Sequence, residues 1–138
     1  MTAIACRGLC VMLRGQRLLD NISLSVPAGQ IAVLTGPSGS GKTTLLHLMG
    51  ALDNPSSGAV LFKGQDIHHG DSKTQARFRN QELGFVYQFH HLLAEFTALE
   101  NTAMPLLIAG ESVASATEKA TRMLGRVGLS HRLNHRPS

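Results

Sequence analysis

The sequence predicts an α/β fold in which a glycine-rich loop joins a buried strand to a helix. Three observations support this prediction. Two β-forming runs near the N-terminus, residues 3–13 and 18–26, are separated by a short turn. A continuous apolar run at 31–35 is typical of a strand buried on both faces. Glycines and a lysine follow that run directly, and apolar residues with helical spacing come next.

The first two runs predict an antiparallel hairpin with one solvent-exposed face. Apolar and polar residues alternate over 21–26, and 14–16 (Arg-Gly-Gln) supply the turn. Cys6 and Cys10 both fall in the first run, where four residues at about 3.3 Å each separate them by about 13 Å. That separation is too long for a disulfide, so we expect two reduced thiols.

The middle of the chain predicts alternating helices and strands. Apolar spacing predicts a helix over 43–51, and the turn-forming residues 53–58 end it. A short strand is predicted over 59–63, followed by a charged helix over 72–81. The apolar run 83–87 then predicts a second strand buried on both faces.

The C-terminal third is predicted to be helical. Residues 97–108 have helical character that Pro105 is expected to interrupt. Residues 112–127 have the clearest amphipathic pattern in the chain. Ser115 and Glu118 have the spacing of a capping box, which would move the start of this helix by one turn.

The composition argues against two classes of protein. The 138 residues carry a net charge of +4 with no basic stripe, and five Phe, one Tyr and no Trp offer no stacking platform for single-stranded nucleic acid. Nucleic acid is therefore not expected as a direct ligand. No apolar run of about 18 residues and no signal peptide pattern are present, so we expect a cytoplasmic chain.

Residues 36–43 match the pattern G-x-x-x-x-G-K-[ST] between the predicted strand and helix. Glycines let the backbone N–H groups converge on phosphate oxygens, and the helix N-terminus adds partial positive charge. Lys42 is expected to reach the β and γ phosphates, the Thr43 hydroxyl to ligate Mg²⁺, and Thr44 to contact a further phosphate oxygen. The predicted phosphate-binding residues are Gly36, Pro37, Ser38, Gly39, Ser40, Gly41, Lys42, Thr43 and Thr44.

With these residues the chain resembles the nucleotide-binding subunits of ABC transporters. The hairpin before 36–43, the run 53–58 (Asp-Asn-Pro-Ser-Ser-Gly) and the run 83–89 (Leu-Gly-Phe-Val-Tyr-Gln-Phe) carry the resemblance. Within that family, three further segments are most similar to ATPase subunits of lipoprotein-releasing transporters, the LolD type: 89–93, 96–101 and 103–107. The resemblance covers the whole chain.

The resemblance implies a P-loop NTPase fold of the ABC ATPase type that binds MgATP. It divides the chain into a nucleotide-binding core over 1–90 and the beginning of an α-helical subdomain over 91–138. Gln88 is then the catalytic Q-loop glutamine, which positions water and shares Mg²⁺ with Thr43. The family's membrane-embedded subunits would contact the region from Phe89 to Leu107. The resemblance also implies that the complete protein forms a homodimer of ATPase subunits. This dimer would be cytoplasmic and peripheral on the inner face of the bacterial inner membrane.

Two departures from the family pattern affect these expectations. Leu13 lies where the family usually has an aromatic side chain on the adenine ring, and losing that stacking should weaken adenine binding by about 1–3 kcal/mol. The chain also ends where the family continues into its signature motif. We therefore expect the downstream half of the fold, with its Walker B and switch residues, to be absent, and the 138-residue chain alone not to hydrolyse ATP.

The sequence is also compatible with two other functions. A truncated, catalytically inactive nucleotide-binding fragment would share the phosphate loop but not the transport activity. A soluble ABC-type ATPase that does not serve a transporter would share the whole motif set.

Overall fold

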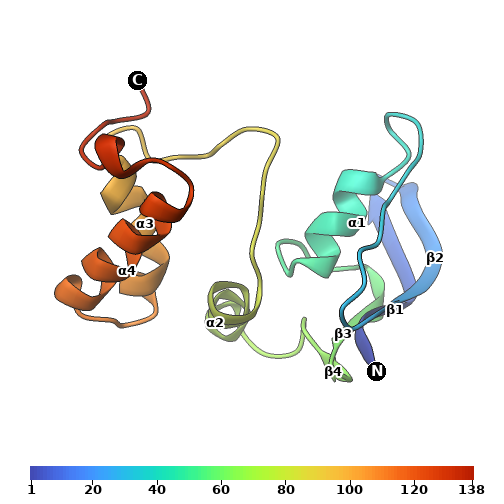
Figure 1. Ribbon diagram of the computed structural model, residues 1–138. Coiled ribbons are helices and arrows are strands. Elements are labelled where there is room, and N and C mark those ends of the chain that lie inside the picture. The colour runs from blue at the N-terminus through green and yellow to red at the C-terminus, as the bar shows by residue number, and fades with distance from the viewer. The chain divides into compact units, whose positions relative to one another are not determined.

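The computed structural model describes all 138 residues and divides into two compact units, Met1–Arg79 and Asn80–Ser138. The first unit holds the sheet and the glycine-rich loop, and the second is helical (Figure 1). No helix in the chain combines the length and the apolar character needed to span a membrane.

A four-stranded antiparallel sheet forms most of the first unit. Its strands are β1 (Thr2–Leu13), β2 (Gln16–Pro27), β3 (Ser57–Phe62) and β4 (Gln65–Asp66), in the order β2-β1-β3-β4. The predicted hairpin is confirmed, because Leu13 pairs with Gln16 across a two-residue turn. Arg14 and Gly15 both have positive φ, at 50° and 77°. A two-residue turn of that kind matches the natural twist of the strands it joins.

One face of the sheet packs against helix α1 (Lys42–Met49) to form the core. Leu9 and Val60 from the sheet and Leu48 from α1 are completely buried. Truncating a leucine at such a site costs about 2–5 kcal/mol, because the cavity left behind closes only partly. Cys6 belongs to the same core, and burial raises the pKa of its thiol. Neither cysteine forms a disulfide.

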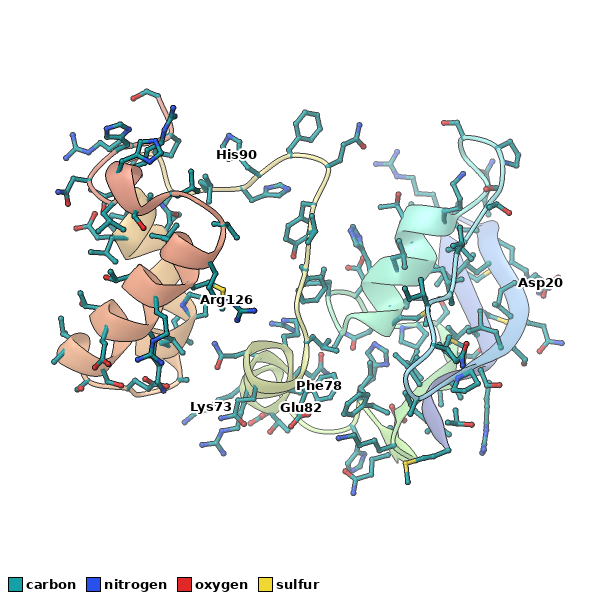
Figure 2. The ribbon with its side chains drawn as sticks, in the orientation of Figure 1. Asp20, Lys73, Phe78, Glu82, His90 and Arg126 are labelled. Carbon is teal, nitrogen blue, oxygen red and sulfur yellow. The ribbon has the colours of Figure 1, made fainter.

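Helix α2 (Ser72–Glu82) begins after Asp71 and packs on the sheet through one aromatic side chain. The Asp71 carboxylate accepts hydrogen bonds from the Thr74 backbone and hydroxyl, both at 2.8 Å, and these bonds lower the pKa of Asp71. Phe78 meets Phe62 of β3 edge to face, with ring centroids 5.2 Å apart. Figure 2 shows Phe78 on this helix.

The helical second unit is built on α3 (Ala98–Ile108) and α4 (Val113–Arg126), followed by a 3₁₀ turn at Ser130–Arg132. Ala103 of α3 and Ala116 and Ala120 of α4 form its buried core, so the two helices approach closely through small side chains.

Two details of these helices differ from the sequence prediction. Pro105 lies inside α3 without interrupting it, because a proline removes a single amide donor and the surrounding turns keep their bonds. The Ser115–Glu118 capping box is also wrong. Ser112 caps α4 by accepting a hydrogen bond from the Ser115 amide at 3.2 Å, so the helix begins at Val113. A capping box does occur, but at Thr97 and Glu100 of α3.

The largest difference concerns the two runs predicted as buried strands, 31–35 and 83–87. Neither run is a strand, and no backbone hydrogen bond joins either one to another segment. Ile31 is 93% and Val33 80% exposed, and Val86 is fully exposed. The reason is that an apolar strand becomes buried only between paired neighbours, and the antiparallel sheet pairs no strand with either run.

We expect the exposed apolar run 31–35 to make the chain self-associate, because unpaired backbone groups beside apolar side chains are a template for intermolecular pairing. Val33→Lys should raise the monomer fraction in size-exclusion chromatography with light scattering. Ile108→Lys is the matched control, since Ile108 is also exposed but ends a hydrogen-bonded helix. Equal effects of the two substitutions would contradict a role for strand pairing.

Candidate phosphate-binding site

The glycine-rich loop leads from the exposed run 31–35 into helix α1. Gly39 and Gly41 have φ values of +82° and +95°, a region that side chains with a Cβ rarely adopt. The loop is closed by a turn in which the Ser40 amide donates to the Pro37 carbonyl at 3.2 Å and the Ser40 hydroxyl donates to the same oxygen at 2.7 Å. The motif therefore folds as a compact, defined turn.

Gly41 holds the end of this loop directly against the sheet. It is the N-cap residue of α1, and its carbonyl accepts the first helical hydrogen bond, from the Leu45 amide at 2.9 Å. A Cβ added at Gly41 would lie 2.8 Å from Cδ2 of Leu19 and 3.4 Å from the carbonyl oxygen of Leu18. Both belong to β2, so this glycine allows the start of α1 to sit on the hairpin.

The ammonium group of Lys42 folds back over the loop. Its Nζ donates to the Pro37 carbonyl at 2.8 Å and also to the Gly36 carbonyl. Lys42 forms no ion pair, and the first turn of α1 contains no acidic side chain. The positive charge of the loop is therefore not neutralised within the chain.

The groups gathered here have the chemistry that a phosphate requires. The first amides of α1, on Lys42, Thr43 and Thr44, have no backbone acceptor, and no side chain caps this end of the helix. The helix N-terminus carries partial positive charge, and the ammonium of Lys42 adds a full charge. The hydroxyl of Thr43 is an oxygen ligand of the type that Mg²⁺ accepts. The donor set thus fits a phosphate group with its metal ion.

The structure gathers the residues predicted from 36 to 44 into this loop and the first turn of α1. Leu13 belongs to the same unit, where it ends β1 beside the hairpin turn and is 57% exposed. Gln88 belongs to the second unit and follows a pair of stacked aromatic rings, Phe85 and Tyr87, with centroids 5.6 Å apart.

Asn101 is a residue that sequence reasoning missed. Its Oδ1 accepts from the Leu93 amide at 2.9 Å, and its Nδ2 donates to the carbonyls of Leu93, Phe96 and Thr97 at 3.1, 3.2 and 3.1 Å. One side chain thus holds the loop between Gln88 and α3 on the helix. The Thr97–Glu100 capping spacing marks this helix start in the sequence and could have directed attention to it.

The comparison with protein families gives one match over most of the chain. Residues 19–138 match the family profile described as ABC transporter. The lipoprotein-releasing system ATP-binding protein LolD of Shewanella denitrificans (strain OS217) is 53% identical over 122 residues. That alignment covers 88% of this chain and 52% of the relative, so the chain spans about half the length of that curated protein.

Solved structures with the same fold include two of the ATP-binding cassette MJ0796. One is a dimeric post-hydrolysis state bound to ADP and Pi, and the other is a dimer described as a bacterial ABC transporter cassette. Both have a TM-score of 0.86, with 28% and 29% sequence identity. Each alignment covers 97% of this chain and 61% of the cassette, and the predicted P-loop fold class is confirmed.

Gly41→Ala should destabilise the first unit more than Gly39→Ala. Positive φ costs each alanine about 1–3 kcal/mol. At Gly41 the added methyl group also collides with Leu19, which adds about 1–3 kcal/mol of overpacking, whereas nothing lies within 4 Å of a Cβ at Gly39. Chemical denaturation followed by circular dichroism measures both variants. Equal losses of stability would show that a methyl group at Gly41 does not collide with Leu19 at a measurable cost in the free energy of unfolding.

Proposed function

The chain belongs to the ABC transporter family, and from that premise we propose that it binds MgATP for a transporter that releases lipoproteins from the inner membrane. The observation that supports nucleotide binding is the group of donors at the start of α1: backbone amides without acceptors, threonine hydroxyls, and the Lys42 ammonium, which forms no ion pair. The likeness to LolD of Shewanella denitrificans supports the lipoprotein cargo.

In this proposal each loop residue has a defined role. The backbone amides of the loop and of the first turn of α1 hold the phosphate oxygens, and Lys42 exchanges its two carbonyl acceptors for the β and γ phosphates. Thr43 would supply an oxygen ligand to Mg²⁺, and Thr44 would donate to a further phosphate oxygen. Gln88 keeps the role at the metal that the family pattern assigns to it. Mg²⁺ supplies the charge that neutralises the phosphates.

Hydrolysis of ATP is the activity of the family, but for this 138-residue chain we propose binding without turnover. Turnover requires a carboxylate at the metal and a group that orients water at the γ phosphate. The first turn of α1 has no acidic side chain, and Gln88 is the only residue that the family pattern assigns to that task here. A catalytically inactive nucleotide-binding fragment is therefore the second candidate function.

The same family membership is the basis on which we propose the partners. We propose that two ATPase subunits of the whole protein pair around two nucleotides, as the dimeric form of MJ0796 supports. The segment from Phe89 to Leu107 would contact the membrane-embedded subunits, and the protein would then lie on the cytoplasmic face of the inner membrane. Phe89 is 74% exposed on this segment, and such an aromatic side chain is a typical anchor for a partner.

Lys42→Ala should weaken the binding of a fluorescent ATP analogue at least about tenfold, because a charge-assisted hydrogen bond contributes about 1.5–3 kcal/mol. Lys63→Ala is the matched control, since Lys63 lies at a sheet turn over the Phe62 ring. Phosphate release, measured on the same samples, should stay at background for both variants and for the original chain. Equal affinities would remove the phosphate-site assignment, and turnover abolished by Lys42→Ala would refute binding without hydrolysis.

Leu13→Tyr should tighten binding of ATP while leaving inorganic triphosphate unchanged. An aromatic ring at this exposed position adds base stacking of about 1–3 kcal/mol, which a ligand without adenine does not receive. Isothermal titration with the two ligands separates these effects. An equal change for both would show that Leu13 does not face the adenine.

A further inference from the structure

The turn between α1 and β3, residues 53–58, contains a serine that binds the end of β1 through two polar groups. The Ser56 hydroxyl accepts a hydrogen bond from the Met12 amide at 2.9 Å. The Ser56 amide donates to the Cys10 carbonyl, also at 2.9 Å. The two hydrogen bonds therefore connect the end of the first strand to the segment that follows α1.

These two bonds replace a strand neighbour that the end of β1 lacks. The pairing of β1 with β3 ends at Cys10 and Ser57, whereas β1 continues to Leu13. Beyond Cys10, β1 pairs with β2 alone, and an isolated hairpin of two strands is marginally stable in water. Ser56 therefore supplies the hydrogen bond that holds the end of β1 on the side of β3.

The turn that contains Ser56 is fixed on both sides of this residue. Gly58 has a φ of +86°, and a Cβ added there would overlap the carbonyl oxygen of Gly8 in β1. The start of β3 therefore lies directly on the backbone of β1. At the other end of the turn, Nε2 of His68 donates to the Asp53 carbonyl at 2.8 Å. Ser56 is thus held in place without a ligand, so binding does not have to order it.

The end of β1 lies beside the phosphate-binding loop. Leu13 is two residues after Val11, and the alternation of side chains along a strand places both on one face. Val11 packs against the core that includes α1, whereas Leu13 is 57% exposed. Across the hairpin, the Leu18 carbonyl lies 3.4 Å from the position of a Cβ at Gly41. Figure 1 shows the hairpin turn beside the start of α1.

We propose that Ser56 is a positioning residue for nucleotide binding, which fixes the end of β1 so that Leu13 meets the base of a nucleotide whose phosphates occupy the loop. This role rests on the proposed function. Ser56 does not touch the ligand, and it acts through the backbone of β1. A fixed aliphatic side chain contacts the base without the entropy cost of being ordered. The phosphates are held by α1, so the contribution of Ser56 is confined to ligands that have a base.

Ser56→Ala removes the acceptor of the Met12 amide and keeps the backbone bond to Cys10. In the ligand-free chain, hydrogen exchange of the Met12 amide should be at least about threefold faster, because a single hydrogen bond is lost. Unchanged exchange of the Leu48 amide in α1 shows that the core is still folded. Ser56→Thr keeps the hydroxyl and should restore slow exchange. Ser57→Ala is the matched control, since Ser57 is the neighbouring exposed serine and pairs with β1 through its backbone.

The binding test compares ATP with inorganic triphosphate, which has no base. Both displace a fluorescent ATP analogue, at a protein concentration low enough to keep the chains monomeric. Ser56→Ala should weaken ATP about threefold to fivefold and leave the affinity for triphosphate unchanged. Leu13→Ala should show the same difference between the two ligands. Because Ser56 acts through Leu13, adding Ser56→Ala to Leu13→Ala should cost no further ATP affinity.

Four results would overturn the proposal. They are an unchanged ATP affinity in folded Ser56→Ala, an equal loss for both ligands, a loss that Ser56→Thr does not restore, and an equal loss in Ser57→Ala. Binding of neither ligand by the original chain is a distinguishable result. It would reject the proposed function, and the base contact with it.

Discussion

The close approach of Gly41 to Leu19 is the constraint on which the phosphate site depends. It places the start of α1 against β2, while Leu45 and Leu48 of the same helix are buried in the core beneath it. The first amides of the helix then point toward the loop, and its apolar side packs against the sheet. A Cβ at this position would press on the buried Leu19 side chain, so the phosphate site and the core both require a glycine here.

The second unit has a comparable centre at the first turn of α3. Thr97 and Glu100 cap the helix, Asn101 holds the preceding loop, and the two first amides bind the C-terminal segment. These bonds use groups that a helix start leaves unpaired, so they stabilise the helix and position its neighbours together. The loop after Gln88 and the segment containing Arg132 and Arg136 therefore belong to one ordered surface.

Local patterns in the sequence predicted much of this fold, and the errors occurred where pairing is not local. The hairpin, the glycine-rich loop and the amphipathic α4 could be predicted because each depends on residues close together in the chain. Residues 31–35 have the composition of a buried strand, but composition does not specify which segment will pair with them. The residue type of Asn101 does not show that its side chain holds the preceding loop on α3. Its four hydrogen bonds depend on how that loop folds back on the helix.

The central claim is that backbone amides at the start of α1, together with Lys42, hold the phosphates of a nucleotide. The most direct measurement is amide NMR of the isotopically labelled chain during titration with MgATP. The account predicts large shifts and slower exchange for the amides of Lys42, Thr43 and Thr44, with small changes along β3. Saturable binding that leaves these three amides unperturbed would contradict it.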